Sequence, residues 1–111
     1  MENELLKNIK TFKTSAELVY SNKDYTSATI LYFKLAFVVL DYIIYQKNKS
    51  IPKDHTERFR ILQKQFFEEY QFLDKFFELY RTTYSLSVEK EKCDLVKENV
   101  NRIMQKYRIP F

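Results

Sequence analysis

The chain has 111 residues, of which 45% are hydrophobic, 17% are Phe or Tyr and none is Gly, and its formal net charge is +4. The absence of Gly excludes the Gly-rich loops that cradle nucleotides, including the P-loop and the dinucleotide fingerprint, and it disfavours hairpins. Lys and Glu are interspersed along most of the chain, which is typical of a solvated surface and not of a nucleic-acid footprint. We therefore expect one all-α domain over residues 1–111.

The first expected helix runs from about Glu2 to Val19. Its apolar residues share one face, with Lys and Glu opposite: Leu5, Ile9, Phe12, Ala16 and Val19. The turn 21–24 follows, in which Ser21, Asn22 and Asp24 are candidate caps for the next helix. Because so short a link leaves no other path, the first two helices should form an antiparallel hairpin.

The second expected helix, from Asp24 to Lys49, is the element around which the others should pack. Two apolar stripes recur along it at spacings of three and four: Tyr25, Ala28, Tyr32, Leu35, Val39, Tyr42, and Ile30, Phe33, Phe37, Leu40, Ile44. The remaining polar stripe is narrow: Ser27, Lys34, Asp41, Asn48. Two apolar stripes predict a central bundle helix that is covered on two sides.

A membrane span is the competing interpretation of this apolar stretch. A spanning helix needs roughly 20 apolar residues in a row, whereas Lys34 and Asp41 interrupt the stretch and leave only a short apolar run between them. The first ten residues contain acidic side chains and no long apolar core, so we expect no secretory signal. One cysteine, Cys93, excludes an internal disulfide and fits a reducing compartment. The sequence predicts a cytoplasmic protein without a membrane segment.

Pro52 marks the end of a polar loop over 46–53 and disfavours helix at the residue before it. Asp54 and Glu57 then have the spacing of a capping box, so a third helix should begin there. No breaker lies between Asp54 and Tyr84. One long helix, or two helices with a bend near Tyr70, fit equally well.

The last helix should follow a break at 85–87, with Ser87 as its cap and Pro110 beyond its end. Its inward residues are expected to be Val88, Leu95, Val96, Val100, Ile103 and Tyr107. The sum is an up-down bundle of four or five antiparallel helices. A bundle of this length has difficulty burying so many Phe and Tyr rings, so we also expect a homodimer.

Two stretches together resemble the HEPN domains, which are small helical bundles. The first is 22–25 followed by Ala28 and a long apolar helix. The second is Asp54 and His55 with Arg58, then 79–84 and a final helix rich in Glu and Lys. The resemblance covers roughly residues 5–107. It implies a four- or five-helix bundle, and in many members a metal-independent RNase formed by a dimer.

The nuclease motif of such proteins is Arg, then about four to six residues of which the first is polar, then His. Arg81 and Thr82 match its start, but positions 86–88 hold Leu, Ser and Val, so the general acid or base is missing. In catalytically silent relatives the resemblance implies association with nucleotide, nucleic acid or a nucleotidyltransferase partner. Arg81 and Tyr84 would then hold a phosphate and stack on a base. Alternatively, Arg81 pairs with a carboxylate of the bundle and Tyr84 closes the core.

His55, the only histidine, has two interpretations as well. Lys53, His55 and Arg58 form an anion-binding corner at a helix start, aided by free backbone amides, or His55 is exposed with Arg58 solvated one turn later. One His and one Cys far apart do not make a metal site, and no cofactor is expected. The function predicted is a non-catalytic HEPN-like module, with a helical protein-interaction adaptor as the alternative. A tetratricopeptide array is excluded because the stretch 20–32 does not recur about 34 residues later.

Overall fold

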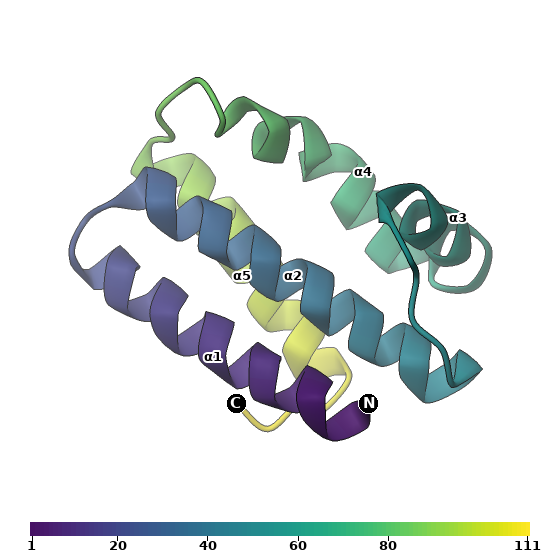
Figure 1. Cartoon of the computed structure of the whole chain (residues 1–111). Coiled ribbons are helices and arrows are strands. Elements are labelled where there is room, and N and C mark those ends of the chain that lie inside the picture. The colour runs from purple at the N-terminus through teal and green to yellow at the C-terminus, as the bar shows by residue number, and fades with distance from the viewer.

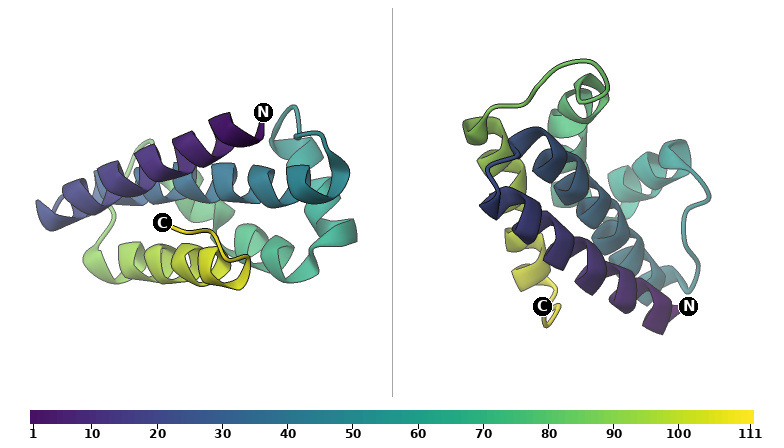
Figure 2. Two further views of the ribbon diagram at one scale, coloured as in Figure 1. Left: turned by 90° about the horizontal axis from the view of Figure 1, so that it is seen from below. Right: turned by 60° about the vertical axis from the view of Figure 1, so that its left-hand side comes forward.

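The computed structural model describes residues 1–111 and consists of five helices without a strand. In chain order these are α1 (Glu2–Ser21), α2 (Tyr25–Asn48), α3 (His55–Gln65), α4 (Phe67–Thr82) and α5 (Lys90–Lys106). The prediction of an all-α bundle is confirmed. In Figure 1, α1, α2 and α4 run side by side across the view, whereas the short α3 is seen almost end-on. In the left view of Figure 2, α5 lies below the α1–α2 hairpin, and the C-terminal Phe111 accepts a hydrogen bond from Lys13 of α1.

α2 is the central helix, as its two apolar stripes predict. It is the only helix whose backbone adjoins all four others. Most residues of both stripes are buried in one core cluster of 22 residues, to which α2 contributes Ala28, Tyr32, Phe33, Leu35, Ala36, Phe37, Val39, Leu40, Ile43 and Ile44. Burying this many apolar side chains is the main favourable term that positions the other helices.

By length and composition alone, α2 is long and apolar enough to cross a membrane. The charged residues Lys34 and Asp41 therefore do not make this helix too polar, by composition alone, to cross a membrane. In the structure, 61% of its most apolar stretch is buried inside the bundle. The core helix of a soluble protein has the same two features, and the cellular location of the chain stays a prediction.

The ends of α2 follow from local chemistry. Asp24 caps its start by accepting a hydrogen bond from the Ser27 amide at 3.1 Å, as expected of an N-cap carboxylate. Its last turn closes through Lys49, which takes the left-handed conformation with φ of 60°. Gly usually occupies this position because it has no Cβ. In a chain without Gly, Lys23 and Arg108 also take positive φ near helix ends.

The region 54–84 forms two helices, with the break at Phe66 and not near Tyr70. Phe66 has φ of −141° and ψ of 65°, so its backbone leaves the helical region and interrupts the hydrogen-bond ladder. No Gly or Pro marks this position. The Phe66 ring packs at 6.5 Å from the ring of Tyr107 at the end of α5, and tertiary packing of this kind overrides local helix propensity.

Two expectations for the last helix are wrong. Ser87 does not cap α5, because the helix begins at Lys90 with Glu89 before it and no side-chain cap. Leu95 does not face the core; it is 48% exposed. α4 and α5 diverge enough to leave a furrow between them, and Leu95 lies on the wall of that furrow. The other inward residues of α5 are buried or half-buried as predicted.

Tyr32 carries the one buried hydroxyl of the core that has no hydrogen-bond partner, although its residue is only 1% exposed. Burial raises the pKa of this phenol. Because an unpaired buried polar group is costly, Tyr32→Phe is expected to raise the free energy of unfolding by about 1 kcal/mol. Urea unfolding measures this change. A loss of stability would show instead that the hydroxyl makes a stabilising bond in solution.

Candidate ligand-binding site

An ion pair attaches α3 to the central helix. Arg58 donates from Nε to Asp41 Oδ1 at 2.8 Å and from Nη2 to Asp41 Oδ2 at 3.0 Å. The two side chains are only 10% and 14% exposed, and the guanidinium lies 5.1 Å from the centre of the Phe37 ring. Arg58 is therefore neither solvated nor free to hold an anion. Arg58 and Asp41 form a bidentate ion pair, which is the geometry in which Arg and a carboxylate bind most strongly.

His55 lies in the first turn of α3, against the same ion pair. Its Nδ1 is 2.7 Å from Arg58 Nη1. Its ring packs 4.8 Å from Phe37 and 5.3 Å from Phe77, measured between ring centres. Desolvation and the charge of Arg58 lower the pKa of His55, so the imidazole is neutral at pH 7. Nδ1 then accepts from Arg58, which leaves Nε2–H as a hydrogen-bond donor.

This geometry predicts a pH dependence of stability. The unfolded His binds a proton below a pKa of about 6.5, whereas folded His55 resists it. The stability contribution of His55 should therefore be complete above the unfolded pKa and fall as the pH drops below about 6.5, with a slope of no more than about 1.4 kcal/mol per pH unit. His55→Phe should flatten this slope, measured by urea unfolding across that range. An unchanged slope would assign the effect to another group.

Tyr84 continues this aromatic cluster into solvent. Tyr80 is buried and lies 6.2 Å from His55 and 5.1 Å from Phe37, measured between ring centres. Its hydroxyl lies 3.1 Å from the hydroxyl of Tyr84, and this bond together with burial raises the pKa of Tyr80 to about 12. Tyr84 itself is 77% exposed, so it does not close the core. It presents a ring to solvent beside Tyr80, which in turn contacts His55.

The predicted basic residues have different surroundings. Arg81 is exposed and pairs at 3.4 Å with Glu78 on its own helix, a pairing too solvated to hold it firmly. Lys53 is exposed as well. The start of α3 is a capping box: Asp54 accepts from the Glu57 amide at 2.8 Å, and Glu57 reaches back to the Lys53 amide at 3.3 Å. These amides are therefore not free for an anion, because two carboxylates already occupy the helix start.

Lys34 is a further cation near His55 that sequence reasoning did not assign to the site. It is exposed on α2, and its charge is among the causes that lower the pKa of His55. The sequence did contain an indication, because Lys34 precedes Asp41 by seven residues and therefore lies on the same polar stripe of α2. We call the group Lys34, His55, Tyr80, Tyr84 and Arg81 the His55–Tyr84 face, in which Tyr80 links His55 to Tyr84 and Arg81 precedes Tyr84 by three residues. It combines an exposed ring, a neutral donor and two cations.

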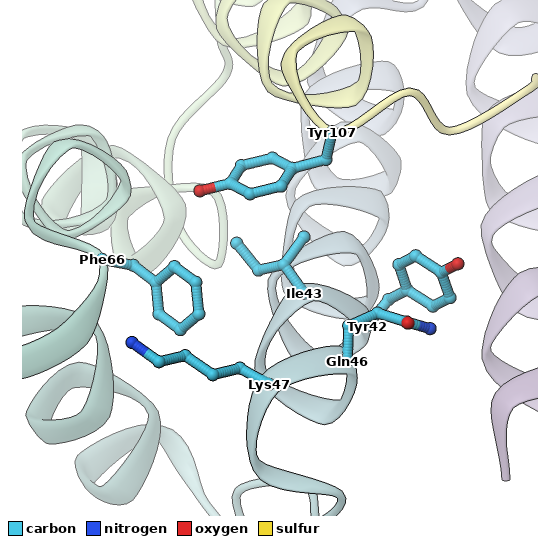
Figure 3. A pocket seen from close by; sticks show the side chains of 6 residues that line it. All are labelled: Tyr42, Ile43, Gln46, Lys47, Phe66 and Tyr107. Atoms are coloured by element: carbon cyan, nitrogen blue, oxygen red, sulfur yellow. The ribbon is translucent and has the colours of Figure 1, made fainter.

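A second hollow, of about 380 Å³, lies at the far end of α2. Figure 3 shows Lys47 and Phe66 approaching each other on one side, with Tyr107 opposite and Ile43 between them. The hydroxyl of Tyr107 donates to the buried Glu69 at 2.6 Å, and Lys106 also pairs with Glu69, at 2.9 Å. The negative charge of Glu69 is thereby balanced by the charge of Lys106. This hollow offers no pair of groups for acid–base chemistry.

No group of three or more His, Cys, Asp or Glu side chains is placed to hold a metal ion. The thiol of Cys93 is buried, and desolvation raises its pKa, which makes it a poor nucleophile. Comparison with known proteins found no matching family model, no matching curated protein and no matching solved structure. The His55–Tyr84 face is therefore interpreted from its own chemistry.

Proposed function

We propose that this chain is a non-catalytic, HEPN-like helical module whose His55–Tyr84 face binds single-stranded RNA or a nucleotide. The observation that carries the proposal is the exposed ring of Tyr84, 77% accessible and hydrogen-bonded through its hydroxyl to buried Tyr80. Proteins that bind single strands stack bases on such rings and place cations along the backbone path. Lys34 and Arg81 supply the cations, and Nε2–H of His55 supplies a donor.

Binding without cleavage fits the state of the imidazole. A general base needs a free ring nitrogen and a pKa near the working pH. The Nδ1 of His55 is engaged by Arg58, and its pKa is lowered. Positions 86–88, where the resemblance would require His, hold an exposed Leu, an exposed Ser and a buried Val. The face therefore supports recognition better than catalysis.

The test is fluorescence anisotropy with a labelled single-stranded RNA of about ten nucleotides. Stacking on one ring contributes about 1–3 kcal/mol, so Tyr84→Ala is expected to weaken binding about fivefold or more. Lys34→Ala should lower the salt slope of log K by about 1. Phe67→Ala, which removes another exposed ring of α4 outside this face, is the matched control and should bind normally. Absence of saturable binding, or equal loss in the control, would refute the proposal.

A protein-interaction adaptor is the second candidate function. It is favoured by the apolar furrow between α4 and α5, where Leu86 and Leu95 are 64% and 48% exposed. The resemblance suggests a nucleotidyltransferase as one such partner, which copurification would test. A homodimer also stays a prediction, and sedimentation at micromolar concentration should give twice the 13.6 kDa chain mass. A strictly monomeric mass would count against it.

A further inference from the structure

A furrow runs between α4 and α5. Three hollows of about 510, 340 and 440 Å³ follow one another along it. Neighbouring hollows share wall residues, including Lys75, Phe76, Leu79 and Lys92. Along α4 the walls extend from Glu68 to Thr82, which at 1.5 Å per residue is about 21 Å.

The walls of the furrow expose aliphatic side chains that the bundle core does not use. Leu95 of α5 is 48% exposed, and Leu86 in the following loop region is 64% exposed. Phe76 and Leu79 of α4 are half-buried between them. Large apolar side chains gathered in one exposed groove, instead of scattered singly, are typical of an interaction surface.

The furrow walls carry three acidic and three basic side chains, and those without an ion pair are mainly basic. Of its acidic wall residues, Glu68 is paired with Lys106 and Glu78 with Arg81, which leaves Glu89. By contrast, the basic wall residues Lys75, Lys92 and Arg102 have no carboxylate within ion-pair distance. A partner that buries the apolar walls would place its own charges beside these cations, and acidic charges would be favoured.

We infer that the furrow binds an acidic amphipathic helix of a partner protein. Such a helix of about 14 residues matches the length of the furrow at 1.5 Å per residue. Its apolar residues at i, i+3 or i+4 and i+7 would contact Phe76, Leu79 and Leu95. Flanking Asp and Glu would then meet Lys75, Lys92 and Arg102.

Two other occupants fit less well. A second copy of the chain would bring the same unpaired cations against each other, which is unfavourable. A single-stranded nucleic acid would match the cations, but the Phe76 ring is half-buried, and the more exposed Leu86 and Leu95 offer poor stacking surfaces compared with aromatic rings. This inference names the kind of partner that the chain would bind if it acts as a protein-interaction adaptor. It does not depend on RNA binding, because no wall residue of the furrow belongs to the His55–Tyr84 face.

The experiment uses two synthetic helical peptides with the same Leu stripe, one with Glu and one with Lys on its flanks. Isothermal titration should show saturable binding of the acidic peptide, at least tenfold tighter than the basic one. Leu95→Asp should weaken it at least tenfold, and Lys92→Glu should weaken it and reduce its salt dependence. Leu18→Asp, at an exposed position of α1, is the matched control and should bind like the parent chain.

Circular dichroism melting verifies that each variant folds, and Leu86→Asp serves as a second furrow variant. Equal binding of the two peptides, or binding unaffected by Leu95→Asp and Leu86→Asp, would overturn the inference. RNA binding that is lost in Leu95→Asp would assign the furrow to nucleic acid. A dimer in sedimentation that is lost in Leu95→Asp would assign it to a second copy. Either result would also overturn the inference, whereas a loss of RNA binding in Tyr84→Ala alone would leave it unaffected.

Discussion

Asp41→Ala is expected to lower the free energy of unfolding by about 3 kcal/mol. Arg58 and Asp41 are paired through two hydrogen bonds, and their side chains are only 10% and 14% exposed. Removing the carboxylate leaves a guanidinium that is buried without its counter-charge, which is the costly case for a buried pair. Urea unfolding, monitored by circular dichroism, measures the loss.

Two further variants separate the buried charge from other effects of the substitution. Replacing both partners, as Asp41→Leu with Arg58→Met, should recover most of the stability, because well-packed apolar residues replace a buried ion pair at little cost. Glu78→Ala, which breaks the exposed pair with Arg81, should change stability little. Equal losses in Asp41→Ala and Glu78→Ala would contradict the assignment of Arg58 as the residue that fastens α3.

Leu40→Ala should cost about 2–5 kcal/mol, a large part of the stability of a domain of this size. Leu40 lies on the second apolar stripe of α2 and is fully buried in the core cluster. The substitution loses the burial of the removed atoms and leaves a cavity that the neighbouring helices fill only partly. Leu18→Ala, on the exposed side of α1, is the control and should change stability by less than about 0.5 kcal/mol. A small effect at Leu40 would contradict the central position of α2.

The features that depend on local periodicity could be predicted from the sequence. The two stripes of α2, its cap at Asp24 and the capping box at Asp54 follow from spacing and side-chain chemistry within one helix. The hairpin of α1 and α2 follows from the short turn. These features involve residues close together in the chain, and the structure places them as expected.

The features that depend on tertiary packing could not be predicted. Nothing in the chain indicates which carboxylate Arg58 pairs with, because Asp41 lies 17 residues away in sequence. The break at Phe66 depends on packing against Tyr107, and the exposure of Leu95 depends on how far α5 lies from α4. Lys34 joins the His55–Tyr84 face only when α3 folds back over α2. The candidate site was therefore predicted by residue type in part, but its arrangement was not.

The most direct test of the central claim is amide chemical-shift mapping of the labelled chain during titration with single-stranded RNA. The proposal predicts that shifts concentrate at Lys34, at the start of α3 around His55, and at 80–84, and that they weaken as salt rises. Tyr84→Ala should remove them while the rest of the spectrum stays the same. Shifts confined to the α4–α5 furrow, or no shifts at any concentration of RNA, would contradict a nucleic-acid-binding role for the His55–Tyr84 face.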